Sequence, residues 1–308
     1  MEHIYDMIII GGGPGGYTAA LYGARAGLDV VILEKLSVGG QMALTMEIDN
    51  YPGFETGIDG YSLGEKMKAG AERFGVKTEY AEVLSVNLSD KIKRVQTSTG
   101  EFLGKTVVLS TGANPRELGI AREKELVGRG VHYCAACDGM FYRGKTVVVV
   151  GGGNTAVEDA LLLSRIAKKV IVVHRRDTLR ADQVYHKPLM KTENVEFYWN
   201  STVEELLGEE YLSGIKLKDV HSGKQTIVQC DGVFVSIGRK PTSELVKEQL
   251  ELDEHGYVKA DESTRTNITG VFAVGDVRTK VLRQVVTAVA DGAVASHYAE
   301  EYLATIKE

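Results

Sequence analysis

Cysteine and proline are both scarce in this chain, and each scarcity excludes a class of protein. With only 3 cysteines in 308 residues, the chain cannot be a small secreted domain held together by a framework of disulfides. With only 5 prolines beside 35 glycines, it lacks the composition of a proline-rich or low-complexity protein. Such a glycine content suits a fold with many tight turns between strands and helices.

An excess of positive charge and a long hydrophobic run are also missing. The formal net charge is −6 and both signs are mixed along the sequence, which argues against binding to nucleic acid or to a membrane surface. The apolar run at residues 7–10 is too short to span a membrane, and no basic segment precedes it as in a signal peptide. We therefore expect a cytoplasmic protein. Its length and its 44% hydrophobic content predict two domains rather than one.

A glycine-rich loop follows the first predicted strand. Residues 7–10 predict a buried strand and residues 17–25 a helix of small residues. The G-x-G-x-x-G loop between them consists of Gly11, Gly13 and Gly16, with Pro14 inside it. Such glycines allow a tight turn and let the backbone approach a pyrophosphate at the helix N-terminus. Glu34 ends the next predicted strand, 30–33, where a carboxylate accepts hydrogen bonds from a ribose diol.

The same unit recurs 140 positions later. Residues 147–150 predict a strand, residues 157–166 a helix and residues 170–173 a second strand. The G-x-G-x-x-A loop between the first strand and the helix contains Gly151, Gly153, Asn154, Thr155 and Ala156. Gly151 is the counterpart of Gly11, so the sequence predicts two dinucleotide sites.

The two copies differ at the end of the second strand. His174 takes the place of Glu34, and Arg175, Arg176 and Arg180 follow it. Guanidinium groups bind a 2′-phosphate in a bidentate manner, whereas an acid favours a free ribose hydroxyl. We therefore predict that the second site binds NADPH rather than NADH, with His174 as part of a basic edge. The alternative is a solvated basic turn.

A Cys-x-x-Cys pair lies near the middle of the chain. Cys134 and Cys137 are followed directly by Asp138. This spacing lets the two sulfurs form a disulfide and suits thiol–disulfide exchange, because it lowers the pKa of one thiol. Asp138 is placed to pass protons to and from the departing thiolate. We interpret these three residues as catalytic.

The alternative for the cysteine pair is half of a zinc site. Such a site needs four ligands, and the remaining cysteine, Cys230, has no second Cys and no His beside it. We therefore predict no metal, and we interpret Cys230 as a buried apolar residue in a strand.

Polar residues after other predicted strands are candidates for the first site. Gly112 follows a strand at 107–109, where the backbone is expected to approach a ligand closely. Gly275 and Asp276 follow a strand at 271–274, and an Asp there either holds a polyol such as ribityl or caps a helix. Two further segments, Gly39-Gly40-Gln41 and Asn50, either line a flat heterocycle or are plain loops. Arg283-Gln284 leads into a long helix predicted at 285–303.

Together these elements resemble the low-molecular-weight, bacterial-type thioredoxin reductases over essentially the full length. The resemblance implies an α/β fold with two Rossmann-like dinucleotide-binding domains of three-layer ββα architecture. The domain that binds NADPH, residues 116–246, is then inserted into a domain that binds FAD, residues 1–115 and 247–308. The predicted secondary structure is interrupted at Asn114-Pro115 and at residues 238–242, and both places suit such crossings between domains. The resemblance also implies a homodimer.

The resemblance assigns residues to both cofactors. Those expected to bind FAD are Gly11, Gly13, Pro14, Gly16, Glu34, Lys35, Gly40, Gln41, Asn50, Gly112, Gly275, Asp276, Arg283, Gln284 and Val285. Those expected to bind NADPH are Gly151, Gly153, Asn154, Thr155, Ala156, His174, Arg175, Arg176, Arg180 and Gly238.

The implied activity is the NADPH-dependent reduction of thioredoxin through FAD and a Cys134–Cys137 disulfide. Cys137 would face the flavin, Cys134 would attack the substrate disulfide and Asp138 would shuttle the proton. The inserted domain would rotate on the crossings near Asn114 and Pro241. One departure from the family is Ala136, where members often carry Thr, and we expect it only to tune the redox potential.

The alternatives of the same fold are a ferredoxin-dependent flavin thioredoxin reductase and a dithiol oxidase, and of another class a flavin-based redox sensor. The first two often lack the basic cluster at Arg175, Arg176 and Arg180, which argues against them here. An NADPH–ferredoxin reductase has no use for the cysteine pair.

Overall fold

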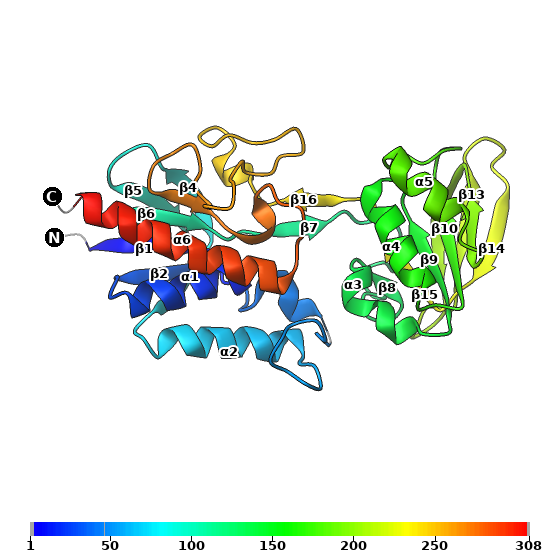
Figure 1. Cartoon of the computed structure of the whole chain (residues 1–308), viewed down its shortest axis with the longest axis horizontal. Helices are drawn as coiled ribbons and strands as arrows, with labels where there is room; N and C mark the ends of the chain where they lie inside the picture. Colours follow the sequence, from blue (N-terminus) through cyan, green and yellow to red (C-terminus); the bar gives the residue numbers. More distant parts are fainter. Residues whose placement is uncertain (1–2, 46, 307–308) are drawn as a thin grey trace. The chain divides into compact units, whose positions relative to one another are not determined.

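The chain forms two compact units in the computed structural model, which describes residues 3–45 and 47–306. The first unit comprises Met1–Asn114 and Lys240–Glu308, and the second comprises Pro115–Arg239. The chain crosses between them on β7 (Ala113–Pro115) and β16 (Arg239–Pro241), which pair with each other (Figure 1).

A parallel sheet forms the centre of the first unit. Its strands are β1 (Ile4–Ile10), β2 (Val30–Glu34), β3 (Lys77–Tyr80), β6 (Gly100–Leu109) and β17 (Val271–Ala273), with β1 between β2 and β6. An antiparallel meander of β4 (Val83–Asn87) and β5 (Lys93–Thr97) continues from the first half of β6. The helices are α1 (Pro14–Arg25), α2 (Gly60–Glu72) and α6 (Val285–Ile306).

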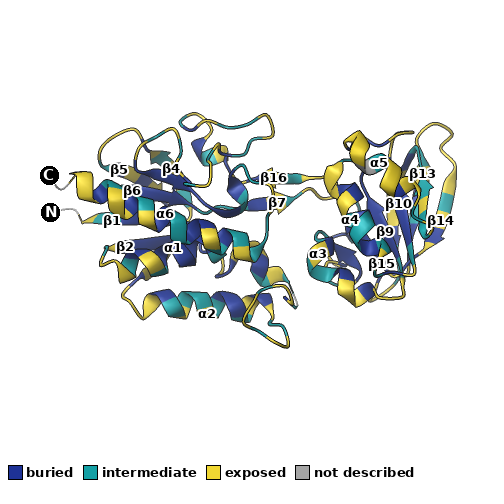
Figure 2. Ribbon diagram, in the orientation of Figure 1, coloured by how far each residue is buried: buried dark blue, intermediate teal, exposed yellow. Residues whose placement is uncertain are grey.

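Both faces of this sheet are covered, as the apolar runs in its strands predict. Met7 and Ile9 of β1 pack into a core with Tyr17 of α1 and Ala295 of α6. Ile8 and Ile10, which point to the other face, pack with residues of the meander side. The central strands are dark blue in Figure 2, while α2 turns an exposed face to solvent.

The second unit repeats this plan. Its parallel strands are β8 (Val131–His132), β9 (Thr146–Val150), β10 (Lys169–Val173), β11 (Val195–Tyr198) and β15 (Gly232–Val235), in the order β11-β10-β9-β15-β8. Its meander consists of β12 (Ser201–Leu207), β13 (Gly214–Asp219) and β14 (Gln225–Gln229), and its helices are α3 (Ala135–Asp138), α4 (Asn154–Ser164) and α5 (Gln183–Met190). Val147 and Val149 pack on the helix side, whereas Val148 and Val150 pack against the meander. The predicted fold class is therefore confirmed.

Residues 240–246 lie with the first unit, although the family resemblance implied that they belong to the inserted domain. The Ser243 hydroxyl donates to the carbonyl of Gly256 at 2.6 Å, and Val246 is buried in the meander-side core. Helix α5 contains Pro188 in its interior, although proline removes one hydrogen bond of a helix. Among the described helices, none is long and apolar enough to cross a bilayer.

Candidate functional site

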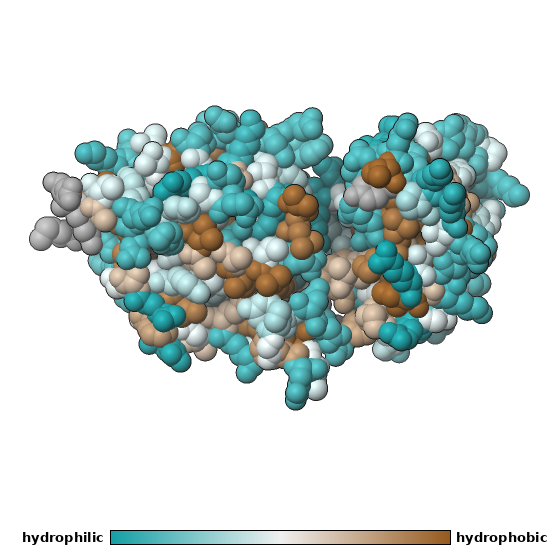
Figure 3. All heavy atoms as spheres, in the orientation of Figure 1, coloured by the Kyte–Doolittle hydropathy of each residue, from teal (hydrophilic) through white to brown (hydrophobic). Residues whose placement is uncertain are grey.

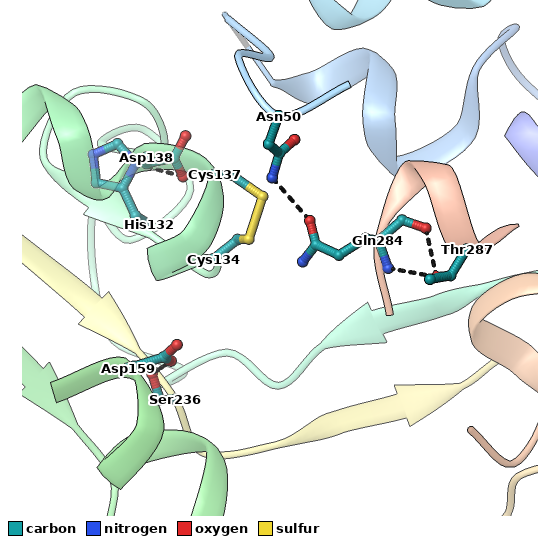
Figure 4. Close-up of a disulfide and its surroundings, with 9 residues drawn as sticks. All are labelled: Asn50, His132, Cys134, Cys137, Asp138, Asp159, Ser236, Gln284 and Thr287. Carbon is teal, nitrogen blue, oxygen red and sulfur yellow. Dashed lines mark hydrogen bonds and ion pairs between the residues drawn. A yellow bond between two sulfur atoms is a disulfide. The ribbon is translucent and has the colours of Figure 1, made fainter. Parts of the chain in front are cut away.

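The cysteine pair lies on a single helical turn in the second unit. Cys134 and Cys137 form a disulfide, and α3 begins directly after Cys134. The backbone N–H groups of Cys137 and Asp138 both donate to the carbonyl of Cys134, at 3.3 and 3.1 Å. This turn brings the sulfurs together and places Asp138 beside them, as Figure 4 shows. The carboxylate of Asp138 lies 3.1 Å from Nδ1 of His132, a residue to which the sequence assigned no role.

Cys230 is a buried free thiol, as predicted. It lies in the link between β14 and β15 rather than within a strand. Burial, with a smaller contribution from Asp231, raises its pKa to about 12, so the thiol stays protonated at neutral pH. Within residues 3–45 and 47–306, no group of three or more His, Cys, Asp and Glu side chains gathers that could hold a metal ion.

The first glycine loop leaves no room for a side chain at Gly11 or Gly16. A Cβ at Gly11 would lie 2.4 Å from the carbonyl oxygen of Ser110, and a Cβ at Gly16 would lie 2.1 Å from that of Gly11. Helix α1 begins at Pro14 with no side-chain cap on its first N–H groups, which fits a pyrophosphate. Glu34 accepts a hydrogen bond from the Gly12 N–H at 2.7 Å and so holds the loop. A carboxylate has further lone pairs, and a ribose hydroxyl fits there as well.

Other predicted first-site residues form polar contacts with each other, with Asn114 and with nearby backbone. Asn50 donates from Nδ2 to Oε1 of Gln284 at 3.0 Å, the dashed line in Figure 4, although the two are 234 positions apart. Gln41, in the short helix η1 (Gly40–Leu44), donates to Oδ1 of Asn114 at 2.8 Å. Arg283 holds the turn before α6 by donating to the carbonyls of Asp276 and Arg278, at 3.4 and 3.2 Å.

The remaining predicted residues of this site lie at strand and helix ends. Lys35 is exposed after β2 and pairs with Glu82 at 2.7 Å. Gly112 follows β6 with a φ of +70°, and Gly275 begins the short helix η4 (Gly275–Val277) with a φ of +71°. Both values favour glycine. Asp276 lies within η4, and Val285 begins α6.

A buried charge network supports the Gly275 turn and was not predicted from the sequence. Asp291 of α6 accepts hydrogen bonds from the N–H of Gly275, from Arg278 and from Lys280, at 2.8, 2.7 and 2.7 Å. Burial alone would raise the pKa of Asp291, but the hydrogen bonds from Arg278 and Lys280 outweigh it and lower the pKa. The carboxylate therefore stays ionised and fixes the strand-to-helix turn. An acidic residue within the apolar α6 was the available signal.

The second glycine loop repeats the close approach of the first. A Cβ at Gly151 would lie 2.3 Å from the carbonyl oxygen of Ser236, the counterpart of Ser110. Helix α4 begins at Asn154, again with no side-chain cap on its first N–H groups. Asn154 also exchanges two hydrogen bonds with Asp182, at 2.9 and 2.8 Å. Thr155 is exposed beside it and Ala156 is buried under the loop.

His174 lies under this loop rather than beside it. A Cβ at Gly152 would meet its ring atoms at 2.4–2.5 Å. Its Nε2 has no hydrogen-bond partner among the described residues. Burial, with the positive charges of Arg180, Arg176 and Arg175, lowers the pKa of His174, so the ring is neutral at neutral pH.

The arginines themselves are exposed, as a phosphate-binding edge requires. Arg180 is tied to the loop, because its N–H donates to the carbonyl of Gly152 at 2.6 Å. Arg175 and Arg176 follow directly after β10 and His174. A 2′-phosphate fits this basic edge. Gly238 has a φ of +101°, and its carbonyl accepts from the N–H of Arg116 at 3.0 Å.

Known proteins resemble the chain throughout. The family model "Pyridine nucleotide-disulphide oxidoreductase" matches residues 5–292. The thioredoxin reductase of Listeria monocytogenes is 46% identical over 308 residues, which cover all of this chain and 96% of that protein. The thioredoxin reductase of Treponema pallidum is 43% identical over 307 residues and is covered completely. The crystal structure of thioredoxin reductase from Streptococcus pyogenes superposes with a TM-score of 0.93 at 42% identity, covering 99% of this chain and all of that one.

A disulfide on a short turn, in a chain with two dinucleotide-type loops, defines a disulfide oxidoreductase of the two-domain class. The chain belongs to the pyridine nucleotide-disulphide oxidoreductase family, and within it to the bacterial-type thioredoxin reductases.

The contact between Gly152 and His174 gives a testable prediction. The change Gly152→Ala places a methyl group against the buried ring of His174, closer than normal packing allows. It should lower the free energy of unfolding by about 1–3 kcal/mol. Gly153→Ala is the matched control, because a Cβ there meets nothing within 4 Å among the described residues. Urea unfolding of both variants measures the difference. Equal midpoints would contradict the packing of His174 under the loop.

Proposed function

We propose that this protein is a thioredoxin-disulfide reductase that uses NADPH and carries FAD. The observation that carries the proposal is the Cys134–Cys137 disulfide, followed by Asp138, on a unit that has a dinucleotide-type loop of its own. Membership in the family supports the same activity and the same two cofactors.

The first unit is proposed to hold FAD. Its phosphates fit the start of α1 at Pro14, where no side chain caps the first backbone N–H groups of the helix. Glu34 is proposed to bind the ribose, and the Asp276 turn to bind the polyol chain. When bound, FAD supplies two-electron transfer between a nicotinamide and a disulfide. The second unit is proposed to hold NADPH at the start of α4, with the 2′-phosphate on Arg175, Arg176 and Arg180.

The chain's own side chains then carry out disulfide exchange. In the reduced enzyme, Cys134 attacks a sulfur of thioredoxin, and a mixed disulfide forms. Cys137 attacks Cys134 and releases reduced thioredoxin. Asp138 supplies the proton that the departing thiolate needs. Over the whole cycle, NADPH and one proton reduce one disulfide to two thiols.

The alternatives lack support. A ferredoxin-dependent enzyme or a dithiol oxidase has no use for the arginine edge beside Gly152. Multiple turnovers on thioredoxin would exclude a flavin-based redox sensor. The rotation of the units on β7 and β16 stays a prediction.

We also propose that the protein is a cytoplasmic homodimer. Three large hydrophobic side chains at or just before the start of α6 are exposed: Val281, Leu282 and Val286. Figure 3 shows brown hydrophobic side chains gathered over α6 on one face of the first unit. A second copy of the chain would remove such side chains from water.

Replacement of the redox cysteines should separate the two half-reactions. Cys134→Ser and Cys137→Ser should each lower thioredoxin reduction by more than about 1000-fold, because the exchange needs both sulfurs. NADPH should still bleach the yellow flavin in both variants in an anaerobic titration. Cys230→Ala is the control and should keep wild-type turnover, because its thiol is buried and protonated. A colourless protein unable to take up flavin would refute the proposed function.

The arginine edge should determine the choice of coenzyme. Arg175→Ala and Arg176→Ala should each raise the KM for NADPH by about 10- to 100-fold, the effect of losing a charged hydrogen bond. The KM for NADH should not change. Lys187→Ala, at an exposed position of α5, is the control. Equal effects on both coenzymes would exclude binding of the 2′-phosphate by these arginines.

The oligomeric state can be measured directly. Light scattering on the eluting protein should give twice the 33.5 kDa of one chain. A mass of one chain across micromolar concentrations would disprove the homodimer.

A further inference from the structure

The imidazole of His132 joins the carboxylate beside the redox cysteines to a buried phenol. Its Nδ1 lies 3.1 Å from Oδ2 of Asp138, and its Nε2 lies 2.6 Å from the hydroxyl of Tyr142. His132 is only 8% exposed and Tyr142 only 6%. Figure 4 shows the His132 ring turned toward Asp138, next to the disulfide. Asp138, His132 and Tyr142 thus form one hydrogen-bonded chain that begins at the residue after Cys137; we call it the proton chain.

The sheet of the second unit holds the proton chain in place. His132 ends β8 and lies opposite Phe234 of β15. Its ring stacks on that of Phe234 with centroids 5.3 Å apart, and the Tyr142 ring meets Phe234 edge-on at 5.4 Å. Gly232 makes room for this arrangement, because a Cβ there would lie 2.4 Å from Cε1 of Tyr142. The position of His132 is therefore built by the fold and does not depend on the cysteine turn.

The hydrogen bonds assign a tautomer to His132. Burial, together with the negative charges of Asp138 and Asp231 and the Cys230 thiol, raises the pKa of Tyr142 well above its usual range. The phenol therefore keeps its proton and donates it to Nε2. Neutral His132 then carries its own proton on Nδ1 and donates toward Asp138.

Other groups near the proton chain complete its electrostatic surroundings. Nζ of Lys145 lies 5.3 Å from the centre of the Tyr142 ring. Phe234, on the face opposite, brings no titratable group. The proton of the chain is thus held between one carboxylate and one imidazole.

This arrangement matters because a carboxyl alone is a poor proton donor at neutral pH. An ordinary Asp titrates near pH ~4, so only about one molecule in a thousand carries the proton at pH 7. An imidazole titrates near ~6.5, and two coupled groups take up and release protons as a pair. A hydrogen-bonded Asp–His pair can therefore keep its proton on the imidazole and pass it to the carboxyl during the reaction.

We propose that His132 is a positioning residue that shares a proton with Asp138, so that the pair, and not the carboxylate alone, supplies the proton for disulfide exchange. This rests on the proposed function. As Cys137 attacks Cys134, a new S–S bond forms between them and the bond from Cys134 to the substrate sulfur breaks. The electron pair of the broken bond stays on the substrate sulfur, which takes the proton from Asp138. Before this step His132 is an imidazolium, which donates from Nδ1 to Asp138 and from Nε2 to the oxygen of Tyr142. It passes the Nδ1 proton to Asp138 and becomes neutral, and water returns that proton when the disulfide is next reduced.

The test compares pH profiles of kcat/KM for thioredoxin and for lipoamide, a small alkyl disulfide. His132→Asn keeps an N–H donor near the position of Nδ1 but cannot carry a positive charge, so Asp138 stays positioned. We expect this variant to be about 100-fold slower at pH 7. The alkaline limb expected of the wild-type profile, where the pair has lost its proton, should disappear. Tyr142→Phe keeps the ring packed on Phe234 but removes the hydroxyl that fixes the tautomer of His132. The alkaline limb of the pH profile should therefore shift in this variant.

His221→Asn is the matched control, because His221 is an exposed histidine of the same unit. Bleaching of the flavin by NADPH should be unchanged in all variants, which checks that they fold. A pH profile of His132→Asn identical to that of the wild type would overturn the proposal, whatever the absolute rate. If the wild type reduced lipoamide but not thioredoxin, the proposed function would fail while the lipoamide profiles still decided the role of His132.

Discussion

The fold depends on backbone meeting backbone at the first glycine of each loop. At Gly11 a Cβ would lie 2.4 Å from the carbonyl oxygen of Ser110, and at Gly151 it would lie 2.3 Å from that of Ser236. Ser110 follows β6 and Ser236 follows β15, strands that lie far along the chain from the loops they touch. Each phosphate-type loop is thus closed only when the parallel sheet has its correct order, so that the binding feature and the sheet form together.

The residue at the end of the second strand supports the loop in both units, although one of these residues is an acid and the other a histidine. Glu34 accepts the N–H of Gly12, whereas the His174 ring packs under Gly152. In both cases the side chain lies against the middle glycine of the loop. A side chain at this position can contact a ligand or support the loop. Because His174 is buried and neutral, its role is to support the loop. The proposed selection of NADPH then depends on the exposed arginines that follow.

Local patterns in the sequence were enough to predict the strands on either side of each glycine loop, the loops themselves and the cysteine turn. Met7 and Ile9 face the helices while Ile8 and Ile10 face the meander, so a continuous apolar run correctly indicates a strand buried on both faces. The network of Asp291, Arg278 and Lys280 could not be found in this way. Its charges are buried within an otherwise apolar helix and turn, and only the packing of α6 against η4 brings them together.

The proton chain could not be predicted from the sequence for a different reason. His132, Asp138 and Tyr142 lie within a short stretch of sequence, yet their contacts depend on β15, which arrives about a hundred positions later. Phe234 and Gly232 fix the rings of His132 and Tyr142, and α3 alone has few contacts with which to fix Asp138. The turn of α3 carries two sulfurs whose bond is repeatedly made and broken. The contact of Asp138 with His132 fixes the carboxylate from outside this turn. The sheet, by holding His132, therefore also holds Asp138 from outside the turn that carries the sulfurs.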